Sequence, residues 1–598
     1  MTRGLCCAAA LLAFAAGAAA QVDTTARRDT TARDSIARRD SIRRDSIAAD
    51  TVPRYLPVLA EQIAPGPRPR GTRYTFTVDS FTLSNVQTLS DLLAHIPGVY
   101  VARGGIYGAA EPVLFGSRGP AGLEVYWDGV PYLPLGRDSL YLDPARISLA
   151  PLERVDVIIL PASLRVYLVT ARQRSTATAS QIGVASGEVR TANYRGAYLR
   201  RWRSGVGLSL VADYNNNEGI GTTSSTPFNA VDLWFKGEYV PSPHLGASYQ
   251  LLSSSWHRAA GSATADWHTQ RRDGILRLFA ATREDGLGYR AEAAFATTSV
   301  TNDTAVLDRS LSQGMLKLSG DWPRAHVDVG VRTLDEARPW QLEATAAWAP
   351  PLPGLTLAAD ARRATYSRGR NGERAHLAAG LTLPAGLSLH GDLAWARDLQ
   401  APVDTADTVQ RTLDLSGAVR WDRDWITLEV GEGSRDPFAP IGFPVGISPL
   451  DSTRPSTVRT PYVTAHGTVR LLPGLELGGW YLNPLVVGGT DFEPPYHSRL
   501  SLTFYSKFWR VYRSGIFALR GELALESWSH GTAGLDSAGA LVALPGRSFG
   551  EVNIEIRIAG VTIFWIQRNA TLGMGSYVPG LDYPRHFQFY GVRWRFTN

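Results

Sequence analysis

The stretch EVNIEIRI at residues 551–558 shows most clearly how the second part of this chain is built. Apolar side chains occupy its even positions and polar side chains its odd positions. Because successive side chains of a β-strand point to opposite faces, such a strand separates an apolar from a polar environment. Similar alternation occurs around residues 326–332, 413–421 and 519–526. The pattern predicts many strands that each have one apolar and one polar face, in either an antiparallel sandwich or a membrane barrel.

The connections between these segments alternate in length. Short turns rich in Pro, Gly, Asp and Ser lie near residues 203–204, 241–243, 285–286, 323–324, 351–354, 384–386, 422–424, 473–474, 513–514 and 559–560. Longer polar connections lie between them, such as 215–229, 255–273, 435–458 and 483–497. Short periplasmic turns and long extracellular loops are typical of outer-membrane barrels, and two strands per short turn plus one at each end predict about 22 antiparallel strands.

Aromatic residues recur near the ends of the predicted strands. They include Trp234, Trp256, Trp340, Trp348, Trp395, Trp421, Trp425, Trp480, Trp528 and Trp594. Rings with a polar atom collect at membrane–water interfaces, so we interpret these residues as interfacial girdles. Ordinary packing between sheets is the alternative. We predict an all-β transmembrane barrel over residues 179–598.

The N-terminal region has the layout of an exported chain. Residues 1–20 combine Arg3, an apolar run and the small residues Ala18 to Ala20, which is typical of a secretory signal peptide. Both cysteines, Cys6 and Cys7, lie inside that segment, so we expect no disulfide in the mature protein. The low-complexity Arg/Asp/Ser-rich arm and Pro-rich linker over residues 21–71 predict disorder. The formal charge of +6 is spread over 598 residues of mixed sign, which argues against nucleic-acid binding.

A small α+β domain is predicted over residues 72–178, between the linker and the barrel. It contains an alternating strand at 74–78 and a short amphipathic helix beginning at Leu89 that Pro97 and Gly98 end. Brief strands with Gly-rich turns follow. A 22-stranded barrel has a wide lumen that must be filled, and we expect this domain to occupy it.

The order of motifs in this domain resembles the plug of TonB-dependent outer-membrane receptors. The matching segments are LLAHIPGV at 92–99, GSRG at 116–119, VYWDGVP at 125–131 and LERVDV at 152–157. The resemblance implies a plugged barrel that imports a scarce small ligand: siderophore-like, cobalamin-like, a glycan or a peptide. It also implies a TonB-like periplasmic energy-coupling protein, outer-membrane lipid and a small-molecule ligand as partners, and we expect a monomer.

The resemblance also implies where a ligand would bind. The expected contacts at the plug apex are Arg103, Gly104, Tyr107, Pro120, Ala121, Tyr132 and Arg137. Arg and Tyr side chains at a concave site suit an anionic or aromatic ligand, although a purely structural role in the lumen is the alternative. The candidate coupling box, which would pair as a strand with the energy-coupling protein, is Asp50, Thr51 and Val52. Pro53 follows at once and removes a backbone donor, so a plain linker is the alternative reading of this segment.

No set of residues in the chain points to catalysis. Histidines are scattered without metal-ligand spacing, and no Gly-x-Ser-x-Gly elbow occurs, so we predict no enzymatic activity, metal or cofactor. The carboxylate pairs 522/526 and 551/555 fall on predicted lumen faces, where we interpret them as solvated charge. Two departures from the family pattern, at Ile159-Leu160 and after Leu164, motivate a second hypothesis. In that hypothesis the plugged barrel is a surface binding scaffold without energised transport.

Overall fold

A computed structural model describes most of the plug region and barrel. The described residues are 55–58, 66–82, 86–104, 111–116, 118, 122–135, 142–219, 227–260, 266–303, 307–335, 338–366, 369–399, 409–438, 458–486, 491–508, 511–512, 516–571, 573, 575–580 and 583–597. The predicted signal peptide, nearly all of the arm and the coupling-box candidate lie outside these ranges. In the described part of the chain, no helix is long and apolar enough to cross a membrane.

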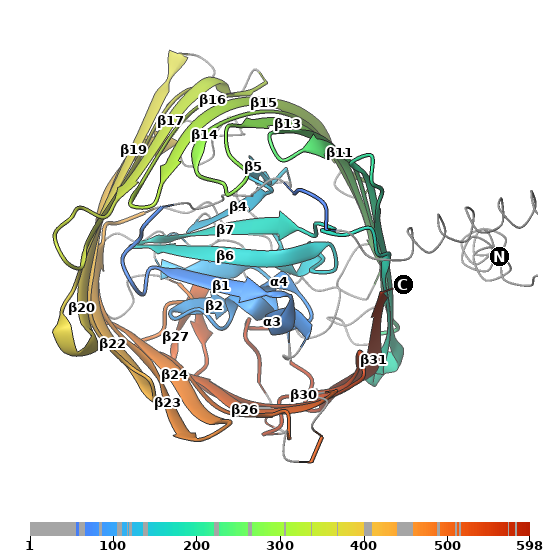
Figure 1. Cartoon of the computed structure of the whole chain (residues 1–598). Coiled ribbons are helices and arrows are strands. Elements are labelled where there is room, and N and C mark those ends of the chain that lie inside the picture. The colour runs from blue at the N-terminus through green and yellow to red at the C-terminus, as the bar shows by residue number, and fades with distance from the viewer. Residues whose placement is uncertain are drawn as a thin grey trace, which may run out of the picture. The chain divides into compact units, whose positions relative to one another are not determined.

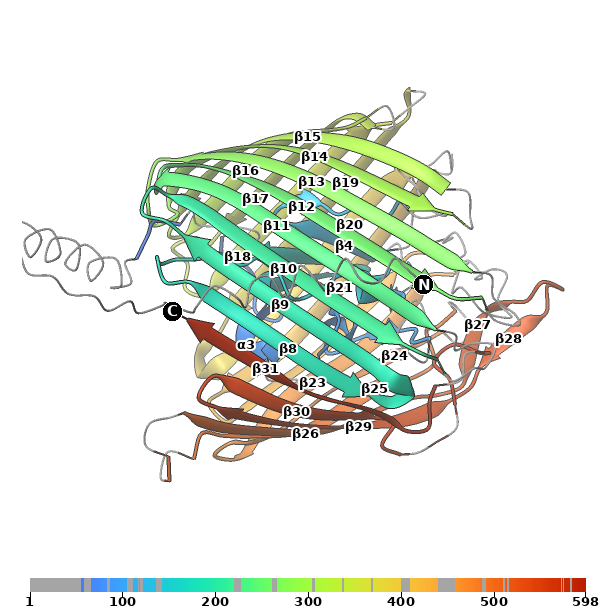
Figure 2. The same ribbon diagram turned by 90° about the vertical axis from the view of Figure 1, so that its right-hand side faces the viewer.

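A closed antiparallel barrel of 22 strands forms the wall of the protein among the described residues (Figure 1). Its strands are β8 (Ala179–Gly187), β9 (Thr191–Arg201), β10 (Val206–Asn217), β11 (Phe228–Ser242), β12 (Leu245–Arg258), β13 (Trp267–Ala281), β14 (Gly288–Asn302), β15 (Leu307–Trp322), β16 (Ala325–Leu334), β17 (Arg338–Trp348), β18 (Leu355–Thr365), β19 (Asn371–Thr382), β20 (Leu387–Leu399), β21 (Val409–Arg423), β22 (Ile426–Arg435), β23 (Thr460–Leu472), β24 (Leu475–Pro484), β25 (His497–Ser506), β26 (Phe517–Trp528), β29 (Arg547–Ile558), β30 (Val561–Arg568) and β31 (Phe587–Thr597). The last strand pairs with the first, with Val592 opposite Val184, and this pairing closes the barrel. Figure 2 shows the strands tilted against the barrel axis. The predicted fold class and strand number are therefore confirmed.

The two rims of the barrel differ as the turn pattern predicts. Nine of the ten predicted short turns join strands at one rim, which we call the turn rim, and the tenth, at 513–514, lies outside the described residues. The opposite loop rim carries the long connections and a separate hairpin, β27 (Gly531–Leu535) and β28 (Leu541–Leu544), which projects beyond the barrel (Figure 2). In outer-membrane barrels the turn rim is periplasmic and the loop rim extracellular.

The alternating pattern sorts side chains between the outer surface and the lumen. On β29, Ile554 and Ile558 are exposed on the outer surface, whereas Glu551 and Glu555 are buried on the lumen side. The charges of this strand thus face the barrel interior and its apolar side chains form the outer band, as expected for a strand in contact with lipid.

The girdle interpretation is correct for some tryptophans and wrong for others. Trp348, Trp425 and Trp594 are about half exposed, as girdle residues should be. Trp234 and Trp528 are buried instead. Successive side chains of a strand point to opposite faces. Leu233 of β11 is exposed on the outer surface, so the next residue, Trp234, faces the barrel interior. The same correction applies to two further residues, since Trp480 is buried and Trp256 lines a cavity inside the barrel.

The prediction of solvated charge on the lumen face is also wrong. The four carboxylates Glu522, Glu526, Glu551 and Glu555 are all nearly fully buried. Arg499 lies 2.8 Å from Glu551 through its Nη2 atom, and the Glu526 carboxylate lies 2.9 Å from His497 Nε2. The lumen is filled by the plug, so these groups are shielded from water, and Glu522, Glu526 and Glu551 lie within ion-pair distance of Arg or His side chains.

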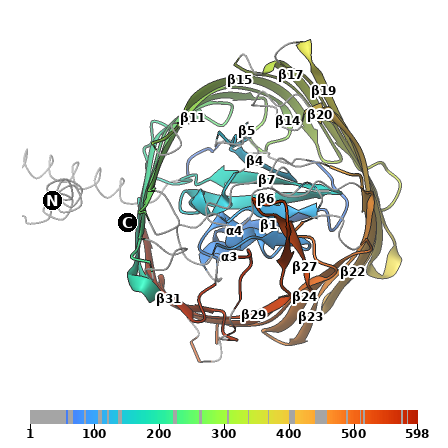
Figure 3. The ribbon, with the colours of Figure 1, turned by 180° about the vertical axis from the view of Figure 1, so that it is seen from behind.

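The plug domain is a mixed sheet with short helices inside the barrel (Figures 1 and 3). Its elements are β1 (Arg73–Thr77), α3 (Val78–Thr82), α4 (Leu89–Leu93), β2 (Val99–Val101), β3 (Val113–Phe115), β4 (Leu123–Trp127), β5 (Val130–Pro131), the 3-10 helix η2 (Pro144–Arg146), β6 (Leu152–Leu160) and β7 (Ser163–Thr170). The sheet order is β1-β6-β7-β4-β5, and β2 pairs with β3 separately. Helix α4 begins with a capping box between Thr88 and Asp91, and Gly98 after it has a φ of 79°. The predicted start at Leu89 is confirmed, but the helix ends at Leu93, four residues before the predicted stop at Pro97 and Gly98.

The apolar core of the plug is continuous with part of the barrel wall. Leu89, Val155 and Leu168 are fully buried, and they belong to one cluster with Trp234 of β11 and Ile275 of β13. The plug therefore packs against the wall through apolar contacts on this side, and polar cavities remain where that packing ends.

Candidate ligand-binding site

One cavity of the plug–wall interface lies toward the loop rim. Its empty space, which includes open solvent, is about 950 Å³, and we call it the outer cavity. Its plug side comes from residues around Thr88, Glu111 and 145–148, and its wall side comes from the loop-rim ends of β9 to β12, β30 and β31. A ligand in this cavity would contact plug and barrel together.

Arg146 is the cation best placed to meet a ligand there. It ends η2, and Asp143 caps this 3-10 helix by accepting a hydrogen bond from the backbone N–H of Ala145 at 3.0 Å. The Arg146 guanidinium lies over the rings of Phe228 and Trp256, with 4.5 and 4.8 Å to their centroids. The same guanidinium also pairs with Asp143, with 3.3 Å between Nε and Oδ2. The cation–π contacts and this ion pair together fix the orientation of the guanidinium in the cavity lining.

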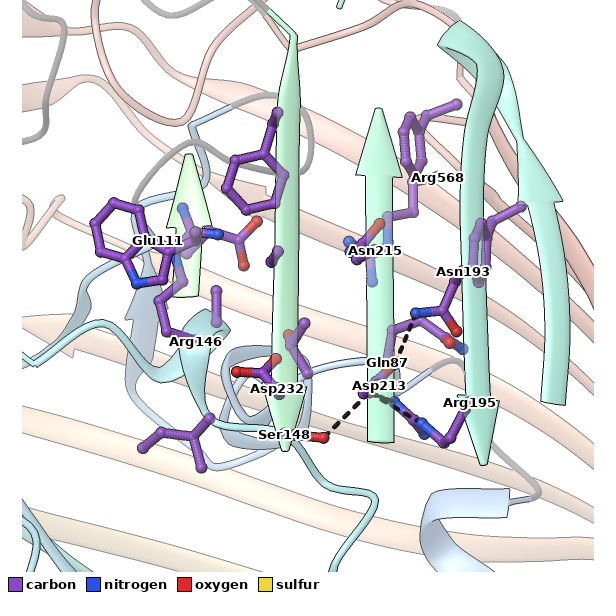
Figure 4. Close-up of a pocket in the computed structure, with 18 residues that line it drawn as sticks. Gln87, Glu111, Arg146, Ser148, Asn193, Arg195, Asp213, Asn215, Asp232 and Arg568 are labelled. Carbon is purple, nitrogen blue, oxygen red and sulfur yellow. Dashed lines mark hydrogen bonds and ion pairs between the residues drawn. The ribbon is translucent and has the colours of Figure 1, made fainter. Parts of the chain in front are cut away.

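Polar groups on the opposite side of the cavity form a network around Asp213 (Figure 4). The Asp213 carboxylate accepts hydrogen bonds from Asn193 Nδ2 at 3.0 Å, from Ser148 Oγ of the plug at 3.1 Å and from Arg195 Nη2 at 2.6 Å. Asp232 lines the same cavity and accepts a hydrogen bond from Ser254 Oγ at 2.5 Å. The cavity lining therefore includes the aromatic-bound Arg146 and three carboxylates, Glu111, Asp213 and Asp232.

The predicted contact Arg103 lies below this cavity and not in its lining. It is 2% exposed, and its Nη1 donates to Asp91 Oδ1 at 2.7 Å. Burial raises the pKa of the Asp91 carboxyl, but the guanidinium groups of Arg568 and Arg103 outweigh burial and hold that pKa well below its usual range. Glu111, which does line the cavity, is 3.8 Å from Arg103. Arg103 thus supports the floor of the outer cavity.

Tyr132 lines a smaller pocket of about 360 Å³ that shares Arg146, Ser148 and Asp232 with the outer cavity. Its ring lies 3.6 Å below the guanidinium carbon of Arg271. Burial raises the pKa of the Tyr132 hydroxyl, so this group stays protonated at neutral pH. Tyr132 is therefore beside the cavity, as a contact residue would need to be.

The remaining predicted contacts divide into two sets. Gly104 is buried at the end of the segment that follows β2. Tyr107, Pro120, Ala121 and Arg137 lie outside the described residues. Sequence reasoning missed Arg146, Asp232 and Trp256. Its one available signal was the Asp143-Pro144 pair, which predicts a capped turn but not the cavity that Arg146 faces.

No metal site is evident in the cavities. Among the residues with described positions, no group of three or more His, Cys, Asp and Glu side chains is arranged to hold an ion.

Comparison with known proteins supports the plug assignment. Residues 70–167 match the TonB-dependent Receptor Plug Domain family. No curated protein sequence matches the chain.

Solved structures with the same fold include a mutant ferric enterobactin receptor, PfeA, from Pseudomonas aeruginosa, with 11% identity and a TM-score of 0.67 over 88% of this chain and 98% of that one. The copper transporter OprC is 12% identical, with a TM-score of 0.69 over 90% of this chain and 100% of that one. The siderophore receptor PirA from Acinetobacter baumannii is 9% identical, with a TM-score of 0.67 over 88% and 98%. At these identities the likeness establishes the fold.

The matched domain and the barrel lead to one conclusion. Residues 70–167 form a TonB-dependent receptor plug domain, this plug lies inside a closed 22-stranded barrel, and the chain has the architecture of TonB-dependent receptors.

Proposed function

We propose that this protein is a TonB-dependent importer of the outer membrane that binds a scarce small ligand in the outer cavity. The observation that carries the proposal is that the cavity joins both domains. Arg146 and Ser148 come from the plug, and Phe228, Trp256 and Asp213 come from the wall. Because the ligand would touch the plug as well as the barrel, movement of the plug would change the site, as import through a plugged barrel requires.

The chemistry of the cavity restricts the ligand class. A guanidinium held between two aromatic rings favours carboxylate, phosphate or catecholate-type oxygens, and the rings themselves favour a flat or apolar portion. The carboxylates Asp213 and Asp232 add acceptors for hydroxyl or amine donors. A small ligand with both anionic and donor groups fits better than a simple ion. The siderophore-like, cobalamin-like, glycan and peptide classes all remain proposals.

The second candidate is a surface binding scaffold without energised transport. It is motivated by the short connection between β6 and β7, where Pro161 and Ala162 join the strands directly, with Leu160 opposite Ser163. The plug sheet nevertheless keeps five strands, and its core packs against the barrel. These features favour the importer over the scaffold.

Two experiments test the proposal. The purified full chain should retain a periplasmic energy-coupling protein in a pull-down, and a chain lacking residues 50–52 should not. In parallel, the ligand that co-purifies with the protein can be identified by mass spectrometry. Its binding should weaken about fivefold in Trp256→Ala, because a cation–π contact of about 1 kcal/mol is lost. Trp348→Ala, on the outer surface, is the control. Equal binding by both variants would exclude the outer cavity as the site.

A further inference from the structure

A second cavity lies between the plug and the wall, nearer the turn rim. It has a volume of about 860 Å³, and we call it the inner cavity. Its wall side runs from β13 to β18, and residues such as Glu292 and Asp328 lie within a few positions of the turn-rim ends of their strands. Its plug side includes Tyr126 of β4 and Tyr167 of β7. No residue of this cavity lines the outer cavity, so the two are separate.

The inner cavity is lined by charged side chains, most of which are paired. The Asp360 carboxylate lies 2.8 Å from Arg165 Nη1, the Asp328 carboxylate lies 3.2 Å from Lys317 Nζ, and Arg277 Nη2 lies 2.7 Å from Glu292. The two aspartates are also shared with histidines, since His376 contacts Asp360 and His326 contacts Asp328, each at 2.8 Å. These carboxylates are therefore already paired with cationic or imidazole groups of the plug and the wall.

Arg68 breaks this pattern. Within the described part of the chain, it has no carboxylate at ion-pair distance, and its shielded Nε has no hydrogen-bond acceptor. Arg332 is similar on the barrel side, because it is 4% exposed and its Nε also lacks an acceptor, although its Nη2 donates to Glu343 at 2.9 Å. A buried donor without a partner destabilises the folded protein. An acceptor placed in the cavity would remove that destabilisation at both guanidinium groups.

Aromatic rings lie beside these donors. Tyr126 and Tyr167 stack with 4.9 Å between ring centroids and 22° between planes. The Arg332 guanidinium lies 5.9 Å from the Tyr126 ring centroid. Two guanidinium groups next to a tyrosine pair form a recognition site for planar oxyanions, whose oxygens accept from the fork of an arginine.

We propose that the inner cavity is a second ligand site, in which Arg68 and Arg332 bind the carboxylate or phosphate oxygens of an anionic molecule. The site is distinct from the outer cavity in position and in lining. Binding of an anion there does not depend on the proposed import. Only its role as a station that the ligand occupies after leaving the outer cavity rests on the proposed function.

The location of Arg68 connects this site to the N-terminal arm. Arg68 lies in residues 66–71, a segment we call the strap, which runs along the turn-rim side of the wall into β1. A Cβ at Gly66 would lie 2.7 Å from His326 Cβ, and one at Gly380 of β19 would lie 2.8 Å from Pro69 Cβ. The strap is therefore packed closely on β16 to β19. Any pull on the arm that lifts the strap removes Arg68 from the cavity and weakens its hold on the anion.

The test uses the full chain in detergent and inorganic pyrophosphate as the probe, with affinity measured by isothermal titration calorimetry. Arg68→Gln removes the free guanidinium. Arg70→Gln is the matched control, because Arg70 lies on the same strap, is 54% exposed and has Asp422 3.7 Å away. We expect pyrophosphate to bind the wild-type chain and Arg70→Gln with equal affinity, and to bind Arg68→Gln at least tenfold more weakly. No binding to the wild-type chain, or equal affinities in the two variants, would overturn the proposal.

A second measurement distinguishes a loss of anion binding from a folding defect. The double variant Arg332→Gln/Glu343→Gln removes the barrel-side donor together with its carboxylate partner, so no charge is left buried alone. It should also weaken pyrophosphate binding at least tenfold, with an unchanged circular dichroism spectrum. Tungstate soaked into crystals should give anomalous density beside Arg68, and density elsewhere only would count against the site. If these binding tests fail, the proposed uptake through the outer cavity is not affected. In turn, loss of uptake on deletion of residues 50–52 does not affect anion binding in the inner cavity.

Discussion

The plug carboxylate Glu124 accepts a hydrogen bond from Arg374 of barrel strand β19, with 2.6 Å between Oε1 and Nη1. Arg165 of the plug and Arg362 of β18 lie 3.3 and 3.9 Å from the same carboxylate. Burial raises the pKa of the Glu124 carboxyl, but the guanidinium groups of Arg362, Arg165 and Arg374 outweigh burial and lower the pKa to about 2. An ionised Glu124 thus links plug strands β4 and β7 to the wall at β18 and β19.

Glu124→Gln should loosen this link. The substitution keeps the size of the side chain and removes the charge that three guanidinium groups share, so we expect the free energy of unfolding to fall by about 2 kcal/mol. Urea unfolding in detergent, followed by near-ultraviolet circular dichroism, measures the loss. Glu373→Gln is the control. Glu373 lies next to Arg374 on β19, it is more exposed than Glu124, and its partner Arg363 is 3.8 Å away. Equal effects of the two substitutions would show that the link contributes nothing.

The same carboxylate predicts a pH dependence. Its pKa is lower in the folded protein, about 2, than its ordinary value of 4.5. The stabilisation is therefore fully present above about pH 4.5 and is lost as the pH falls toward 2. The difference in unfolding free energy between the wild-type chain and Glu124→Gln should shrink over this range. A difference that is constant between pH 5 and pH 3 would contradict the assignment.

The strap offers a steric prediction. Gly66 and Gly129 both have positive φ angles, 85° and 84°, so alanine costs a similar backbone strain at either position. Only at Gly66 would the new Cβ collide with the wall, at 2.7 Å from His326 and 2.9 Å from Ala347, whereas nothing lies within 4 Å at Gly129. Gly66→Ala should displace the strap and speed tryptic cleavage after Arg70 several-fold, whereas Arg68 is followed by Pro69 and is not a tryptic site. Gly129→Ala should leave cleavage there unchanged, and the opposite ranking would refute close docking of the strap.

Gln250 of β12 joins both domains through its amide. Its Oε1 accepts from Trp127 of the plug at 3.1 Å and from Trp234 of the wall at 3.0 Å, and its Nε2 donates to Asp128 at 2.7 Å. Gln250→Leu leaves the indole N–H groups of Trp127 and Trp234 without their acceptor, whereas Asp128 keeps its hydrogen bonds from Thr170, and the loss should cost about 3 kcal/mol. Hydrogen exchange of the plug amides over 123–131 should accelerate. Exchange as slow as in the wild-type chain would show that apolar packing alone holds β4. Gln588→Leu, at the loop rim, serves as the control.

The sequence was informative about the barrel because strand parity and turn length are local properties. The alternation at 551–558 identified the lumen face of β29, and nine short turns within the described residues located one rim. The orientation of the Trp side chains was harder to predict, because proximity to a strand end does not show which face of the strand a ring occupies. Trp234 and Trp256 point inward by parity. Parity, applied residue by residue, would have corrected the girdle prediction.

The site was less predictable for a different reason. The outer cavity is formed by contacts between segments far apart in the chain, such as Arg146 of the plug with Phe228 and Trp256 of the wall. No local pattern reports such a contact. Family resemblance suggested Arg103, which the structure buries against Asp91, and Tyr132, which lies beside the cavity. Arg68 could not be identified from the sequence either, because only the structure shows which cations already have partners.

The central claim is that ligand uptake through this plugged barrel is energised. The most direct test measures surface-bound and internalised amounts of the co-purifying ligand in cells that make the wild-type chain, with and without a protonophore that collapses the proton-motive force. Energised uptake predicts unchanged surface binding and loss of internalised ligand when the protonophore is added. Internalisation that continues at the same rate without the proton-motive force would contradict it.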